Sequence, residues 1–130
     1  MLADTSFLID LMQDDEPART KAEKLVSDSV PLMVGTPTIF ELYVGVGLSL
    51  KSGEEREKVL EVLRALTQLP LDSQSAIRAG IVYAQQAKDG VAIDAEDAMI
   101  AGIALENQQT LLTRNTKHFA GIPGLKVEDY

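Results

Sequence analysis

At 130 residues the chain has the length of one domain, and its 45% hydrophobic and 25% charged residues are typical of a folded globular protein. It has no cysteine and a single histidine, His118, which excludes disulfides, cysteine nucleophiles and zinc sites built on thiolates or several imidazoles. No apolar run approaches the ~20 residues of a membrane span, so we expect one cytoplasmic domain over residues 1–130. The net charge of −8 is unlike the basic footprint usual for nucleic-acid binders.

Apolar segments alternate with amphipathic ones along the chain, which predicts a parallel sheet with helices on both faces. In the first half we expect strands over residues 1–3 and 31–34 and helices over residues 5–12, 15–28, 36–50 and 54–66. Next comes a short edge strand at residues 69–71, because Pro70 cannot donate a ladder hydrogen bond. The remaining elements are helices over residues 73–88 and 94–107 and strands over residues 110–113 and 126–127.

An acid, Asp4, directly follows the first predicted strand. In an open α/β sheet, the carboxyl end of a strand borders the crevice where such folds bind ligands. A charge held there must be offset by a metal ion, a partner or hydrogen bonds. Asp4 is therefore the first candidate for a functional side chain.

Glu41 lies in an apolar helix, where it shares a narrow strip with Thr38, Gly45 and Ser49. A solvated helix face normally carries longer charged residues. This strip of small residues therefore indicates a surface that another group can approach closely, rather than one open to bulk water. The alternative is a partly exposed glutamate on an ordinary amphipathic helix.

Asp94 and Asp97 are spaced three residues apart at the start of a predicted helix, so they project from the same side of its first turn. They are candidate ligands. They are equally well explained as an N-cap and a third-position acid that stabilise the helix terminus. Glu96 points elsewhere, and we expect it to be solvated.

Polar residues also follow the strand predicted at residues 110–113. Asn115 offers a carbonyl oxygen without charge, and Arg114 and Lys117 are cations suited to a phosphate backbone. The alternative is a polar turn before Phe119 packs into the core. His118 is expected to be a surface or packing residue.

Asp4, Glu41 and Asp97 all fall on the carboxyl side of the predicted sheet. Hard oxygen donors without thiol or imidazole partners suit Mg²⁺ or Mn²⁺. Such ions generate hydroxide from bound water and stabilise charge on phosphoryl oxygens, which are the two requirements of phosphodiester hydrolysis.

Three segments of the sequence resemble the PIN-domain ribonucleases, and within them the VapC-like toxins of type II toxin–antitoxin pairs. They are ADTSFLIDL at residues 3–11, TPTIFELYVGV at residues 36–46 and DAMIAGIALENQQTLLTRNTKHFAGIPGLKVEDY at residues 97–130. The resemblance implies a three-layer α/β/α sandwich around a central parallel sheet of four to five short strands.

The resemblance also implies an acidic Mg²⁺ or Mn²⁺ site in which Asp4, Glu41 and Asp97 match the family's first, second and third acids. The family often has a fourth acid where this chain has Asn115, and Asp94 is the candidate to replace it in part. Ser6 resembles a hydroxyl that supports the first acid, and we expect Thr113 to support the site with it.

We therefore expect a metal-dependent endoribonuclease with Arg114 and Lys117 as candidate RNA contacts. The resemblance further implies a homodimer that is inhibited by a cognate antitoxin protein. Two alternatives stay open: a PIN fold that has lost activity, for which Asn115 is the hint, and a flavodoxin-like signalling domain. The flavodoxin-like reading is poor, because Asp4 lacks the adjacent acid that a receiver domain needs.

Overall fold

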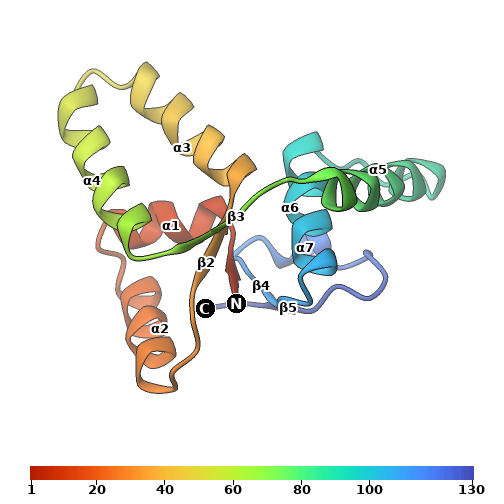
Figure 1. The fold of residues 1–130 in the computed structure, drawn as a ribbon, viewed down its shortest axis with the longest axis horizontal. Coiled ribbons are helices and arrows are strands. Elements are labelled where there is room, and N and C mark those ends of the chain that lie inside the picture. The colour runs from red at the N-terminus through yellow and green to blue at the C-terminus, as the bar shows by residue number, and fades with distance from the viewer.

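The computed structural model describes residues 1–130 as a five-stranded parallel sheet between two groups of helices (Figure 1). The strands are β1 (Leu2–Ala3), β2 (Met33–Gly35), β3 (Thr67–Leu69), β4 (Leu111–Leu112) and β5 (Val127–Glu128). The helices are α1 (Thr5–Met12), α2 (Glu16–Ser27), α3 (Thr36–Leu48), α4 (Ser52–Arg64), α5 (Ser73–Lys88), α6 (Ala95–Glu106) and α7 (Thr116–Phe119). The predicted three-layer α/β/α sandwich is confirmed.

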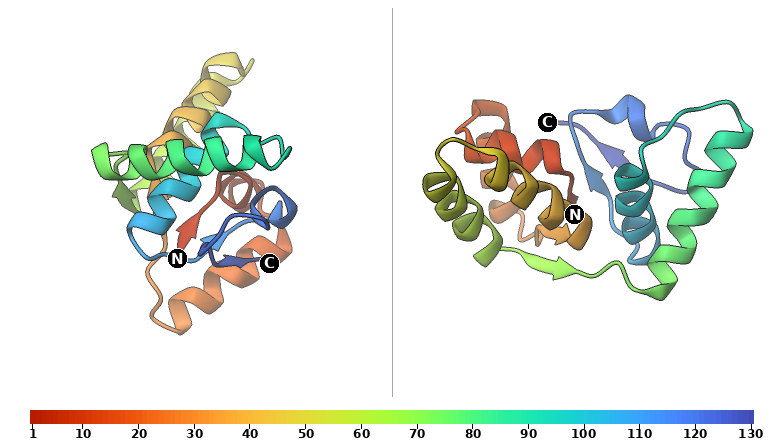
Figure 2. Two further views of the ribbon diagram at one scale, coloured as in Figure 1. Left: turned by 90° about the vertical axis from the view of Figure 1, so that its right-hand side faces the viewer. Right: turned by 90° about the horizontal axis from the view of Figure 1, so that it is seen from above.

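The sheet order is β3-β2-β1-β4-β5, with every neighbouring pair parallel. Because successive strand residues point to opposite faces, the two-residue strands β1 and β4 each contribute to two cores. Ala3 and Leu112 pack with α1 to α4, whereas Leu2 and Leu111 pack with α5 to α7. Figures 1 and 2 show these two groups of helices on opposite sides of the strands. The central strands are therefore buried on both faces.

Local capping signals place the helix boundaries close to the predicted ones. Asp15 accepts a hydrogen bond from the Ala18 N–H at the start of α2, and Asp72 does the same for the Ser75 N–H at the start of α5. None of the helices combines the length and the apolar character needed to cross a bilayer.

Two elements differ from the prediction. The edge strand β3 ends at Leu69, before Pro70, and its residues Thr67–Leu69 pair with β2; the prediction placed it at residues 69–71. Proline cannot donate to the ladder, so pairing is confined to the residues before it. No helix was predicted after β4, where the structure has the short helix α7, and Phe119 at its end is buried.

Helices α5 and α6 pack unusually closely at Gly102. A Cβ atom built at Gly102 would lie 2.6 Å from the carbonyl oxygen of Ser75 and 2.7 Å from the backbone nitrogen of Ala79. Only glycine fits this crossing, since both neighbouring atoms belong to the backbone of α5. The contact fixes α6, whose first turn carries Asp97.

Candidate active site

The sheet order reverses direction at β1, since the chain first builds β2 and β3 on one side and later β4 and β5 on the other. Ligand-binding crevices in open α/β sheets lie at such switch points, outside the carboxyl ends of the strands. Asp4 follows β1 and Thr113 follows β4, so both lie at this point. The order differs from the 2-1-3-4-5 order of flavodoxin-like sheets. The flavodoxin-like alternative is therefore wrong.

Asp4 is 5% exposed and is held by three donors. Its Oδ1 accepts from the Thr5 N–H (2.8 Å), which caps α1. Its Oδ2 accepts from the hydroxyls of Thr113 (2.7 Å) and Ser6 (3.1 Å). The structure thus places both hydroxyls predicted to support the site on one carboxylate oxygen. With its rotamer fixed from three directions, Asp4 presents a preorganised carboxylate at the switch point.

Glu41 reaches the same place from α3. Its Oε1 accepts from the Thr5 hydroxyl (2.8 Å), which also lies 3.2 Å from the buried Thr38 hydroxyl. Burial raises the pKa of Glu41, the Thr5 hydrogen bond opposes this rise, and the charges of Asp4, Glu96 and Asp97 add to it. Thr5 therefore joins the two acids: its N–H binds Asp4 and its hydroxyl binds Glu41.

The strip of small residues on α3 borders a cleft. Glu41, Gly45 and Ser49 line a space of about 360 Å³ together with residues of α1 and α4. Thr38, the fourth member of the predicted strip, is fully buried and lies outside this lining. The cleft leads away from the acids between α1, α3 and α4.

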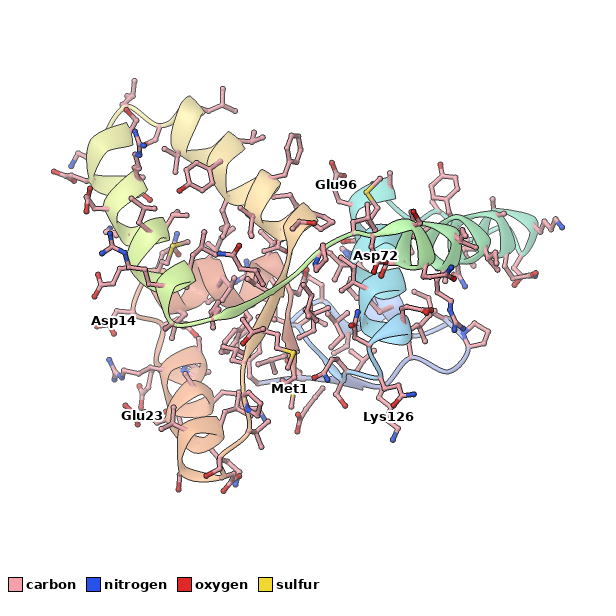
Figure 3. All side chains as sticks on the ribbon, in the orientation of Figure 1. Met1, Asp14, Glu23, Asp72, Glu96 and Lys126 are labelled. Carbon is pink, nitrogen blue, oxygen red and sulfur yellow. The ribbon has the colours of Figure 1, made fainter.

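Asp97 lies in the first turn of α6, with its Oδ2 3.5 Å from Nδ1 of the exposed His118. Burial and then the charge of Asp4 raise the pKa of Asp97 to about 6, although His118 opposes the rise. The exposed Asp94 occupies the N-cap position of α6, but its side chain makes no capping bond. Its charge also raises the pKa of Asp97. Glu96, at the start of α6 in Figure 3, is half-buried where the sequence predicted a solvated side chain.

The three acids influence one another electrostatically, yet they do not form a tight ligand cluster. No group of three or more His, Cys, Asp or Glu side chains is arranged to hold a metal ion. The oxygen donors suit Mg²⁺ or Mn²⁺ chemically, and Mg²⁺ usually keeps several of its waters in protein sites. The carboxylates of Asp4, Glu41 and Asp97 could therefore serve such an ion partly through water, and the metal site stays a prediction.

The polar residues after β4 have different surroundings. Both oxygens of Asp10 accept from Arg114 Nη1 (2.7 and 2.8 Å), so this cation is already paired within the protein. The Asn115 N–H donates to the Thr113 hydroxyl (3.0 Å), and the Asn115 side chain makes no capping bond to α7. Lys117 is exposed and has no ion-pair partner.

Asp10 and Thr5 were not predicted as site residues. Asp10 stands four residues after Ser6, so both lie on the buried face of α1. That spacing was the available signal. Thr5 carried no signal of its own beyond its place next to Asp4.

The sheet order and the acids at its switch point define a small α/β protein with a candidate hydrolytic site. The sequence matches the family model described as "PIN domain" over residues 1–125, and the chain belongs to this family. Two curated relatives carry nuclease names. The "tRNA(fMet)-specific endonuclease VapC" of Salmonella typhimurium is 31% identical over 99 residues, which span 76% of this chain and 75% of the relative. "Ribonuclease VapC1" of Methanocaldococcus jannaschii is 30% identical over 132 residues, 99% of this chain and 87% of the relative.

Solved structures agree with this assignment. The DNA-bound VapBC complex of Salmonella typhimurium contains a chain that is 29% identical, with a TM-score of 0.90 and coverage of 98% of this chain and 96% of that one. VapBC2 of Rickettsia felis, bound to a promoter DNA fragment, has a TM-score of 0.92 at 22% identity, with 99% and 97% coverage, and supports the fold. The predicted membership of a PIN-domain, VapC-like nuclease family is confirmed.

Proposed function

We propose that this protein is an endoribonuclease of the VapC type that depends on Mg²⁺ or Mn²⁺ and hydrolyses RNA phosphodiester bonds. The observation that carries this proposal is the Asp4 carboxylate at the switch point, which Thr113 and Ser6 hold and which Thr5 links to Glu41. The charge of Asp4 also raises the pKa of Asp97, which supports placing the third acid in the same crevice. The VapC names of the relatives support RNA as the substrate class.

The side chains have distinct tasks in this proposal. Asp4, Glu41 and Asp97 would hold the metal, which when bound supplies a hydroxide nucleophile and stabilises phosphoryl charge. Ser6 and Thr113 orient the Asp4 carboxylate through their hydroxyls.

Residues around the acids have secondary roles in the proposal. Asn115, which replaces a fourth acid, would contribute at most a neutral oxygen. Asp94 would supply additional negative charge, because it already raises the pKa of Asp97. Arg114 and Lys117 are the proposed contacts to the RNA backbone.

We further propose that the protein is the toxin of a type II toxin–antitoxin pair. Solved complexes of the related VapBC proteins support an antitoxin partner. A homodimer and a cytoplasmic location stay predictions. The oligomeric state is measured by light scattering of the purified protein.

The test of the proposed activity is RNA cleavage by the purified protein with Mg²⁺, with Mn²⁺ or with EDTA. We expect cleavage only with a metal, and at least a hundredfold loss in the Asp4→Asn variant. Asp14→Asn, which removes the same charge from an exposed ion pair with Arg19, is the matched control and should cleave normally. Equal cleavage by Asp4→Asn and the wild type would exclude this site. Metal binding without any cleavage would support the PIN fold that has lost activity.

A further inference from the structure

Asp10 is a buried carboxylate outside the proposed metal ligands. It lies on α1, one helical turn after Ser6, and is 6% exposed. A buried charge is retained only when it is paired and hydrogen-bonded. Asp10 has three such contacts, two from Arg114 Nη1 (2.7 and 2.8 Å) and one from the Tyr130 hydroxyl (2.6 Å).

Only one nitrogen of the Arg114 guanidinium takes part in this pairing. Its side chain is 54% exposed, and all its hydrogen bonds leave from Nη1. The Nε and Nη2 groups have no partner in the protein. Together they form the planar edge with which arginine binds two phosphate oxygens at once. Asp10 thus holds one end of the guanidinium and leaves a phosphate-binding edge in solvent.

Arg114 is also well placed relative to the acidic crevice. It directly follows Thr113, whose hydroxyl donates to Asp4. The backbone that carries the guanidinium is therefore fixed to the first acid of the site. RNA brought to a cluster of carboxylates meets repulsion of its phosphates, so a cation held at the rim favours binding.

Tyr130 completes the support from the opposite end of the chain. Its ring packs edge-on against Phe7, with ring centroids 4.9 Å apart and planes at 81°. Burial and the neighbouring Asp10 raise the pKa of Tyr130, so its hydroxyl remains a donor at neutral pH. The Asp10 carboxylate is consequently restrained from two sides.

We propose that Asp10 and Tyr130 are positioning residues that preorient Arg114 to bind a phosphate group of RNA next to the acidic crevice. The proposal rests on the proposed ribonuclease function and adds the residues that govern substrate affinity. A side chain held in its binding geometry loses less conformational entropy when the RNA binds. Asp10 thereby strengthens RNA binding although its own charge repels RNA.

This opposition makes the proposal testable by RNA binding in EDTA, with a short fluorescein-labelled single-stranded RNA followed by fluorescence anisotropy. If Asp10 acted only through its charge, Asp10→Asn would tighten binding. We expect the Kd to rise three- to tenfold instead. The matched control Asp14→Asn removes one charge from another Asp–Arg pair and should leave the Kd unchanged or slightly lower.

The variant Arg114→Gln tests the phosphate contact itself, separately from the residues that position it. It should raise the Kd about tenfold and reduce the slope of log Kd against log salt by about 0.7, the value for one phosphate contact on single strands. Asp10→Asn should keep the wild-type slope, because the cation is still present. The double variant should bind like Arg114→Gln alone, since Asp10 acts through Arg114.

Tyr130→Phe provides a milder perturbation that keeps the ring packing, and we expect a two- to threefold rise in the Kd. Unchanged Kd values in Asp10→Asn and Tyr130→Phe, with lower melting temperatures, would show a purely structural network and overturn the proposal. The cleavage assay with Mg²⁺ separates the two proposals. A wild type that binds RNA without cutting it contradicts the nuclease function, while the binding series still decides the role of Asp10.

Discussion

The raised pKa of Asp97 predicts that the acidic crevice weakens the fold when no metal is bound. A pKa of about 6 instead of the ordinary 3.8 means that ionised Asp97 is disfavoured in the folded protein. The full difference corresponds to roughly 3 kcal/mol. The Asp97 side chain is 20% exposed, and water near the acids screens their charges, so the destabilisation of the folded protein is reduced to about 1–2 kcal/mol. We therefore expect Asp97→Asn to stabilise the metal-free protein.

The direction of the pKa shift determines the pH range in which Asp97 destabilises the fold. Because the folded-state pKa is raised, the destabilisation is complete above about pH 6 and disappears as the pH falls toward 3.8. Asp97→Asn should thus raise the melting temperature by about 4–7 °C at pH 7 in EDTA and by almost nothing near pH 4. Loss of the contact with the exposed His118 subtracts little from this gain.

Thermal unfolding followed by circular dichroism measures this effect. Glu57→Gln, which removes an exposed charge without an ion-pair partner, is the matched control and should change the melting temperature by less than about 1 °C. An equal rise in melting temperature at pH 7 and pH 4, or a lower melting temperature at pH 7, would refute the idea that burial and Asp4 destabilise ionised Asp97.

Three further outcomes are expected. Mg²⁺ should raise the melting temperature of the wild type, and it should raise that of Asp4→Asn much less. The apparent affinity for Mg²⁺ should fall between pH 7 and pH 5 because Asp97 takes up a proton, and calorimetric titration at several pH values measures this. Thr113→Val should cost about 1–3 kcal/mol in urea unfolding and reduce RNA cleavage, whereas Thr113→Ser keeps both hydrogen bonds and should behave like the wild type. Gly102→Ala should destabilise by at least about 2 kcal/mol because its Cβ meets α5 backbone, whereas Gly80→Ala, with open space around it, should stabilise by up to about 1 kcal/mol; equal effects would contradict the close crossing.

Local signals explain why so much of the fold was predictable. Asp15 and Asp72 cap their helices with their own side chains, so a few neighbouring residues determine where α2 and α5 begin. The position of β3 was shifted because Leu69 and Leu71 look equally apolar, and only pairing with β2 selects Thr67–Leu69. The sheet order depends on pairing between distant segments, so no local signal predicts it.

In the candidate site, too, some residues were predictable from local sequence and others were not. Asp4 and Asp97 were recognised from their places after a strand and at a helix start. Thr5 donates to Glu41 across 36 positions, and Tyr130 donates to Asp10 across 120, so no local pattern predicts these contacts. Arg114 was predicted to contact RNA and is instead seen on Asp10, which gives that prediction a mechanism to be tested.

The hydrogen bond between Thr113 and Asp4 also has a consequence for synthesis of the protein. A growing chain that ends at residue 107 already contains Asp4, Glu41 and Asp97, yet it lacks β4, the strand that pairs with β1 and supplies Thr113. Because β1 is central, it gains its second neighbour only after residues 111–112 have left the ribosome. Contacts of such long sequence separation also slow folding. The Asp4 carboxylate therefore obtains its full set of hydrogen-bond donors only after Thr113 has been translated, although all three acids are present in the chain well before that point.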